Sequence, residues 1–148
     1  MKYSVYLSVM LFFGVTTIMS AQKNIVSTEQ APKAIGPYNQ AVVAGNMLFA
    51  SGQLGLIPET GKFIEGGVKE QTDQVFKNLN AVLEHGGFSL SDIVSCTVYL
   101  KDMNDFPAMN EVYAKYFTSD YPSRATVQVS RLPKDGLVEI SCIAVHTQ

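Results

Sequence analysis

The sequence predicts a single α/β domain of the α+β kind, in which two helices cover one face of a mixed β-sheet. In several short runs apolar residues alternate with polar ones, which is the period of a strand. In two longer runs they recur at spacings of three and four, which is the period of a helix. In chain order the runs give hairpin, helix, strand, helix, strand, strand. This order implies right-handed crossovers, which place both helices on the same side of the sheet.

The first 21 residues are expected to precede this domain. Lys2 gives a short positive start, residues 5–18 are almost uninterruptedly apolar, and small residues lead up to Ala21. This layout is typical of a secretory signal peptide, and the run is short for a membrane span. We therefore expect cleavage near Ala21, or retention as an anchor. Residues 22–148 would then form a periplasmic or secreted domain.

A β-hairpin is predicted near the start of the domain. Residues 41–44 and 47–50 are apolar runs on either side of Gly45-Asn46, a pair typical of two-residue hairpin turns. Ser51-Gly52 is expected to end the second strand, where a small side chain and an open backbone let a ligand approach closely. The alternative for Ser51 is that it only caps a turn.

Two amphipathic helices follow, separated by a strand over residues 93–100. The first helix ends at Gly86-Gly87, and the second begins at Asp102 or Asn104. The first apolar stripe consists of Val68, Thr72, Val75, Phe76, Leu79, Val82 and Leu83. Asn110 places a polar amide at the edge of the second stripe. By pattern alone such an amide most often bonds to backbone.

Residues 122–145 are predicted to form two short strands joined by a tight Pro-Lys-Asp-Gly connection. Apolar and polar residues alternate in both strands, and the polar positions are Arg124, Thr126, Gln128, Glu139 and Ser141. We expect Arg124 and Glu139 to share the sheet face that the helices leave uncovered. A single charged strand residue is usually a solvated surface group. Both arginines of the chain lie in this stretch, however, and the planar guanidinium suits bidentate binding of a carboxylate.

Composition excludes several classes of site. The net charge is −2 and there is no basic cluster, which disfavours nucleic acid as a partner. The two cysteines and two histidines lack ligand spacing, so no metal site is predicted. Cys96 and Cys142 each fall in an apolar row and are expected to be buried in the core. A disulfide between them would require neighbouring strands with suitable Cβ geometry.

The chain resembles the RidA/YjgF family of reactive-intermediate (enamine/imine) deaminases over essentially all of residues 25–145. The matching segments are Ile-Gly-Pro-Tyr at 35–38, Ser-Gly-Gln at 51–53, residues 102–110, Pro-Ser-Arg-Ala-Thr-Val at 122–127, Arg-Leu-Pro at 131–133 and Val-Glu-Ile at 138–140. The resemblance implies a chorismate-mutase-like fold and a homotrimer with clefts at the subunit interfaces.

The resemblance also implies a chemistry, the hydrolysis of 2-imino acids such as 2-iminopropanoate, the tautomer of 2-aminoacrylate, to 2-oxo acids and ammonia. Arg124 would bind the substrate carboxylate, and Glu139 would orient and deprotonate a water molecule. The cleft would be shaped by Tyr38, Ser51, Gly52, Asn110 and Thr126. The resemblance implies neither a metal nor an organic cofactor.

One residue departs from the family pattern. Thr126 stands where many members carry a modifiable cysteine, so no thiol-based switch is expected at this position. The alternative function is a non-catalytic trimer that binds small carboxylates or acts as a chaperone. Glu139 argues against this alternative, because its charge would repel a carboxylate ligand in the same cleft. A ribonuclease activity fits poorly with the acidic chain.

Overall fold

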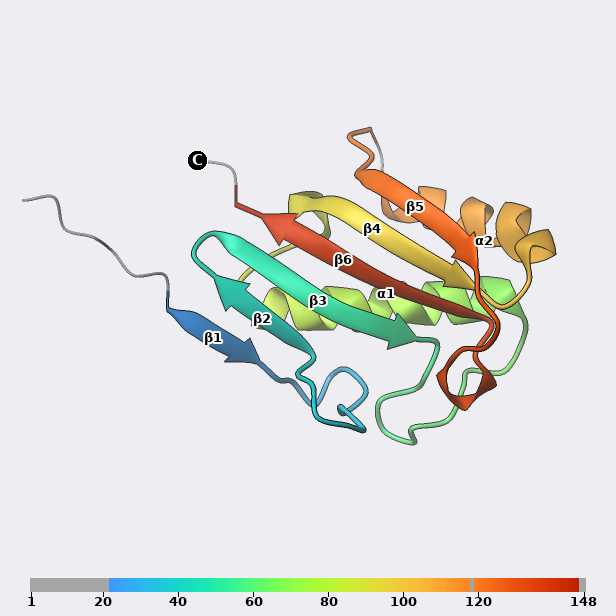
Figure 1. The fold of residues 1–148 in the computed structure, drawn as a ribbon, viewed down its shortest axis with the longest axis horizontal. Helices are drawn as coiled ribbons and strands as arrows, with labels where there is room; N and C mark the ends of the chain where they lie inside the picture. The colour runs from blue at the N-terminus through green and yellow to red at the C-terminus, as the bar shows by residue number, and fades with distance from the viewer. Residues whose placement is uncertain (1–21, 118, 147–148) are drawn as a thin grey trace, which may run out of the picture.

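The computed structural model describes residues 22–117 and 119–146, so the predicted signal peptide lies outside the described residues. Within them, six strands form one sheet and two α-helices pack on one of its faces (Figure 1). The elements are β1 (Lys23–Val26), β2 (Ala41–Ala44), β3 (Met47–Leu54), α1 (Val68–His85), β4 (Ile93–Leu100), α2 (Phe106–Tyr113), β5 (Ser123–Gln128) and β6 (Val138–Val145). The predicted α+β class is confirmed. Neither helix of this described part combines the length and hydrophobicity that a bilayer span requires.

The strand order β1-β2-β3-β6-β4-β5 places β6 in the interior of the sheet. All neighbouring pairs are antiparallel except β4 and β5, which are parallel and are connected through α2. The last two strands are therefore not paired with each other, because β4 lies between them. A short turn at Pro133–Asp135, with Lys134 and Asp135 at positive φ, reverses the chain across the end of β4.

The predicted hairpin of β2 and β3 is confirmed, and Gly45 turns the chain at a φ of 61°. The second strand is longer than expected, since β3 continues to Leu54. Its register with β6 shifts between Ala50 and Gln53, so Ser51 and Gly52 lie at a bulge inside the strand and not at its end. A bulge redirects neighbouring side chains while leaving most of the ladder intact.

Helix α1 begins after Gly67, whose backbone N–H donates to the Glu70 carboxylate at 2.7 Å. The predicted apolar stripe is buried along the sheet. Helix α2 is short and is extended by single 3-10 turns at both ends. Its aromatic side chains pack on Phe76 of α1, whose ring stacks on Tyr116 with centroids 4.4 Å apart. The two helices thus share one aromatic core.

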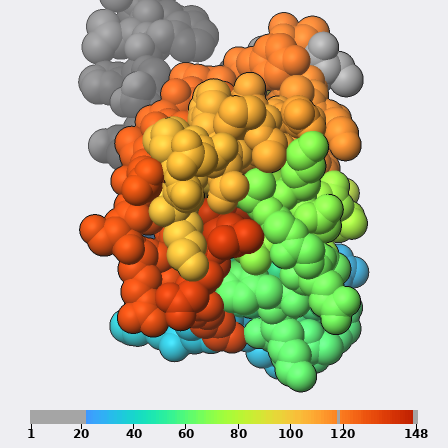
Figure 2. All heavy atoms as spheres, turned by 90° about the vertical axis from the view of Figure 1, so that its right-hand side faces the viewer, coloured from blue at the N-terminus to red at the C-terminus, as the bar shows by residue number. Residues whose placement is uncertain are grey.

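The segment before β6 packs at one end of the molecule, beside the residues that follow β4 and the start of α1 (Figure 2). Leu137 makes both connections through its backbone. Its carbonyl accepts from Lys101 N at 3.0 Å, and its N–H donates to Gln71 Oε1 at 2.9 Å. These bonds fix the start of β6, two residues before Glu139.

Strand β6 separates a covered face from an uncovered one. The side chains of Val138, Ile140, Cys142 and Ala144 are buried against the helices, while Glu139 and Ser141 point to the other side. On that uncovered face Phe49 and Val127 keep 42% and 44% of their surface exposed. Exposed apolar residues in a sheet face are typical of surfaces that a partner covers.

The two cysteines are buried as predicted. Cys96 of β4 and Cys142 of β6 are direct cross-strand partners and are 1% and 3% exposed. Both are free thiols. Burial raises the pKa of Cys142 to about 12, so its thiol stays protonated at neutral pH.

Candidate functional site

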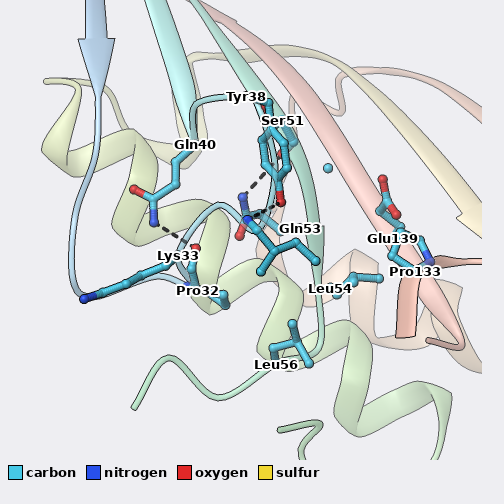
Figure 3. Close-up of a pocket in the computed structure, with 12 residues that line it drawn as sticks. Pro32, Lys33, Tyr38, Gln40, Ser51, Gln53, Leu54, Leu56, Pro133 and Glu139 are labelled. Atoms are coloured by element: carbon cyan, nitrogen blue, oxygen red, sulfur yellow. Dashed lines mark hydrogen bonds between the residues drawn. The ribbon is translucent and has the colours of Figure 1, made fainter. Parts of the chain in front are cut away.

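Glu139 lines a cavity of about 370 Å³ where β3 and β6 meet (Figure 3). The walls come from three segments besides Glu139. The loop before β2 contributes Pro32, Lys33, Ile35, Tyr38 and Gln40, β3 and the residues just after it contribute Ser51, Gly52, Gln53, Leu54 and Leu56, and the turn before β6 contributes Pro133. The cavity therefore combines one carboxylate with mostly apolar walls, the usual composition of a small-molecule site.

Gly52 lies directly against the Glu139 carboxylate. A Cβ atom at position 52 would stand 2.7 Å from Glu139 Cδ, which is closer than real contacts allow. Glycine at the bulge thus leaves the space that the carboxylate occupies. Burial raises the pKa of Glu139 above its usual range, because desolvation disfavours the charged form. A carboxylate in this setting is a stronger base than an exposed one.

Ser51 and Tyr38 line the same cavity as Glu139, Ser51 from β3 and Tyr38 from the loop before β2. The Ser51 hydroxyl donates to the Asn39 carbonyl at 2.7 Å, so it ties β3 to the loop before β2. Tyr38 is 47% exposed, and its hydroxyl accepts from Ile35 N at 3.4 Å. Its ring forms a wall over the cavity (Figure 3). Four of the predicted site residues, Tyr38, Ser51, Gly52 and Glu139, are therefore together in one chain.

Arg124 lies in a second cavity, of about 380 Å³, between α2 and β5. This cavity is lined by Asn110, Tyr113, Ala114, Tyr121, Pro122 and Arg124. The guanidinium carbon stands 4.3 Å from the centroid of the Tyr113 ring and 5.6 Å from that of Phe106. Two aromatic rings thus hold the cation without using its N–H donors in ion pairs.

The other arginine of the chain, Arg131, differs from Arg124 because it is bound in an ion pair. Arg131 Nε and Nη2 donate to the two carboxylate oxygens of Asp135 at 2.7 and 3.1 Å. Arg124 takes part in none of the ion pairs found among the described residues. Of the two guanidinium groups, that of Arg124 is the one available for an anionic ligand.

The prediction that Arg124 and Glu139 share the uncovered face is wrong. Arg124 pairs in register with Cys96, which is buried under the helices, whereas Glu139 pairs with Tyr99 on the opposite face. The reason lies in the edge position of β5. Its helix side is covered only in part by α2, so polar side chains are tolerated there, and Val127 with its apolar neighbours faces the uncovered side. Within one chain the two residues therefore belong to separate cavities.

Asn110 and Thr126 accompany Arg124. Asn110 lines the Arg124 cavity, and Thr126 lies two residues along the same face of β5, next to Val98 of β4. Thr126 Oγ1 and Tyr113 Oη are buried without a hydrogen-bond partner among the described residues. Tyr113 was not among the predicted site residues, although its position one turn after Asn110 on the same helix indicates that it lies beside that residue. No cluster of three or more His, Cys, Asp or Glu side chains suited to a metal ion occurs in the described part of the chain.

The family model described as endoribonuclease L-PSP matches residues 28–146. Three relatives illustrate the range of similarity. A RutC family protein from Pyrococcus horikoshii is 57% identical over 82% of this chain and 97% of its own length. The chloroplastic reactive intermediate deaminase A of Arabidopsis thaliana is 51% identical over 84% of this chain and 67% of its own length. A 2-iminobutanoate/2-iminopropanoate deaminase from Capra hircus is 47% identical over 86% of this chain and 93% of its own length.

Solved structures agree with this assignment. A protein from Thermotoga maritima described as an endoribonuclease candidate is 50% identical, with a TM-score of 0.83 over 86% of this chain and 100% of its own. TdcF of E. coli, whose structure contains bound serine, is 43% identical, with a TM-score of 0.80 over 84% of this chain and 99% of its own. At 50% and 43% sequence identity, these proteins resemble this chain in sequence as well as in fold.

The relatives contradict the prediction of a signal peptide and a periplasmic protein. The family match begins at residue 28, and the archaeal Pyrococcus protein is covered over 97% of its length by 82% of this chain. Almost nothing of that protein is left for a counterpart of residues 1–21. The match over residues 28–146 and the identities of 47 to 57% show that the chain belongs to the RidA/YjgF family.

Proposed function

We propose that this protein is a hydrolase that deaminates reactive 2-imino acids, such as 2-iminopropanoate and 2-iminobutanoate, to 2-oxo acids and ammonia. The observation that carries the proposal is the pairing of chemistries in the two cavities. One holds a desolvated carboxylate, Glu139, and the other holds an arginine without an acidic partner, Arg124. Relatives named reactive intermediate deaminase A, at 51% identity, and 2-iminobutanoate/2-iminopropanoate deaminase, at 47% identity, support it.

Assembly into a homotrimer is part of the proposal. Arg124 and Glu139 open to opposite faces of one sheet, so a site that uses both requires two copies of the chain. In a closed ring, each copy presents one patch to the next copy and a different patch to the previous one. Three copies would then give three sites, each with Arg124 from one subunit and Glu139 from its neighbour. The apolar side chains of the uncovered face would be buried at the same time.

In the proposed reaction, Arg124 binds the substrate carboxylate through two parallel N–H donors. Glu139 removes a proton from a water molecule as the water oxygen forms a bond to the imine carbon. The protonated Glu139 gives its proton to the imine nitrogen, which completes a carbinolamine. Glu139 then takes the hydroxyl proton of the carbinolamine and passes it to the amine nitrogen, so that the C–N bond breaks, the carbonyl forms and ammonia leaves. The TdcF structure, with bound serine, supports a site for a small molecule that carries a carboxylate and an amine.

A direct assay tests this function. A pyridoxal-phosphate dehydratase generates 2-aminoacrylate from serine, and the decay of the imine is followed with and without the protein. We expect the protein to accelerate the decay and release ammonia. If it binds pyruvate without accelerating the decay, the non-catalytic carboxylate-binding alternative holds. Incubation with RNA provides the remaining comparison, and we expect no cleavage because the chain is acidic.

Mixing two inactive variants tests the shared site. Arg124→Ala and Glu139→Gln are unfolded together in equal amounts and refolded into mixed trimers. About a quarter of the interfaces then contain both wild-type side chains, so about a quarter of wild-type activity should return. No recovery would contradict a site shared between subunits. Light scattering on the wild type provides the control, and a monomer at micromolar concentration would contradict the trimer itself.

A further inference from the structure

The loop over residues 27–39 forms the wall of the cavity that faces Glu139. It joins β1 to β2 and contains neither helix nor strand. It carries Lys33, Ile35 and Tyr38, which line the same cavity as Glu139 (Figure 3). Because the loop has no backbone hydrogen bonds of a helix or strand, its position depends on hydrogen bonds to side chains and to neighbouring segments.

One buried side chain supplies most of those bonds. The amide of Gln40 is 3% exposed, and its Oε1 accepts from Thr28 N at 2.6 Å. Its Nε2 donates to the carbonyls of Thr28, Ala31 and Pro32 at 3.0, 3.2 and 2.9 Å. Both amide hydrogens and the amide oxygen are therefore used by backbone groups of the loop.

Only one other side chain shares this task in the described chain. The Ser51 hydroxyl donates to Asn39 O at 2.7 Å, and the Ser51 N–H donates to the carbonyl of Gln40 at 3.0 Å. The remaining hydrogen bonds found within residues 27–39 stay inside the loop. The hydrogen bonds that attach the loop to the rest of the described chain thus gather where Gln40 meets the β3 bulge, while Ala31 of the loop packs into the core.

We infer that Gln40 is a positioning residue, whose buried amide holds the loop 27–39 as a fixed wall over Glu139. The inference rests on the proposed function, and Gln40 acts through the loop, since its polar atoms are already bonded to backbone. Held in this way, the loop excludes water from the carboxylate and fixes Tyr38 above the cavity.

Release of the loop has a specific electrostatic consequence. The cavity that Glu139 lines is also lined by Lys33 and Tyr38 from the loop and by Gln53 from β3, and Tyr99 of β4 is the cross-strand partner of Glu139. Lys33 is paired with Glu29 at 3.1 Å, and desolvation is the cause that raises the pKa of Glu139. If the wall moves away and water enters, the pKa of Glu139 falls toward its ordinary value.

The test is Gln40→Met, which keeps the length of the side chain and removes its donors and acceptor. We expect kcat/KM for the imine to fall by about 10- to 100-fold, mainly through kcat, because the wall and the base are misplaced. The acid limb of the pH–rate profile should move to lower pH. Amide hydrogen exchange should accelerate in residues 27–39 and remain unchanged in β6.

Two control variants separate positioning from stability. Gln30→Met makes the same substitution at an exposed position of the same loop, and Val75→Ala removes buried methyl groups from α1. The first should behave as wild type, and the second should lower the melting temperature without moving the acid limb. A Gln40→Met variant that matches Val75→Ala in every readout would overturn the inference. If the wild type hydrolyses no imine, the proposed function fails. The role of Gln40 in holding the loop is tested separately, because unchanged hydrogen exchange in residues 27–39 of Gln40→Met would overturn it.

Discussion

Replacement of Glu139 by glutamine is expected to lower imine turnover by a factor of about 100 to 10,000. Glutamine keeps the shape of the side chain beside Gly52 but accepts no proton from water. Binding of the product analogues pyruvate and 2-oxobutyrate should survive, or tighten, because a charge that repels their carboxylates is removed. Calorimetry and the imine assay on the same protein measure both quantities. Should this variant turn over imine as fast as wild type, Glu139 is not the base and the carboxylate-binding alternative becomes the better one.

The same variant has a second, opposite signature in stability. The pKa of a glutamate in an unfolded chain is about 4.3, and burial raises the pKa of Glu139 in the folded protein. Its stabilising contribution is therefore fully present below the unfolded pKa and is lost as the pH rises through the folded pKa. Glu139→Gln removes this loss, so its gain in melting temperature over wild type should be larger at pH 7 than at pH 4. Glu59→Gln, at an exposed loop position, serves as the control and should show no such difference.

Arg124→Lys is expected to weaken carboxylate binding and imine turnover together. Lysine keeps the charge but loses the planar fork and its stacking on the Tyr113 ring. One charge-assisted bidentate contact contributes about 1.5 to 3 kcal/mol, which corresponds to a loss of about 10- to 150-fold in affinity. Titration with 2-oxobutyrate and the imine assay measure the two effects.

The second arginine of the chain supplies a matched control. Arg131 is exposed and already bound to Asp135, so Arg131→Lys should change neither affinity nor turnover by more than about twofold. If Arg124→Lys lowered turnover while product binding stayed at the wild-type level, the role of Arg124 would lie in the chemical step and not in holding the carboxylate.

The type and order of the elements were largely predictable from sequence, because each depends on local periodicity. The hairpin turn at Gly45, the long stripe of α1 and the strand β4 are all where the pattern indicates. Strand β1 was missed because three of its four residues are exposed and it has no apolar row. The separation of β5 from β6 was missed because adjacency in the chain does not reveal which strand inserts between two others.

The site was predictable as a set of residues but not as an arrangement. Residue chemistry and the family resemblance singled out Arg124 and Glu139, and alternation correctly grouped Arg124 with Thr126. The face was assigned wrongly because apolar residues such as Val127 were taken to mark the core of the single chain. At a sheet edge, an apolar row can instead mark a face that a second copy covers. Gln40 left no signal at all, since a buried amide that bonds to a loop has no periodicity.

The interior position of β6 determines which wall of the Glu139 cavity can move. The β6 backbone is bonded on one side to β3 and on the other to β4, so Glu139 lies on a part of the molecule that opens only when the whole sheet does. The opposite wall is attached by the hydrogen bonds of Gln40 and Ser51 and by the packing of Ala31, so it can open without opening the sheet. We therefore expect backbone amide hydrogens in wild-type β6 to exchange more slowly than those in residues 27–39.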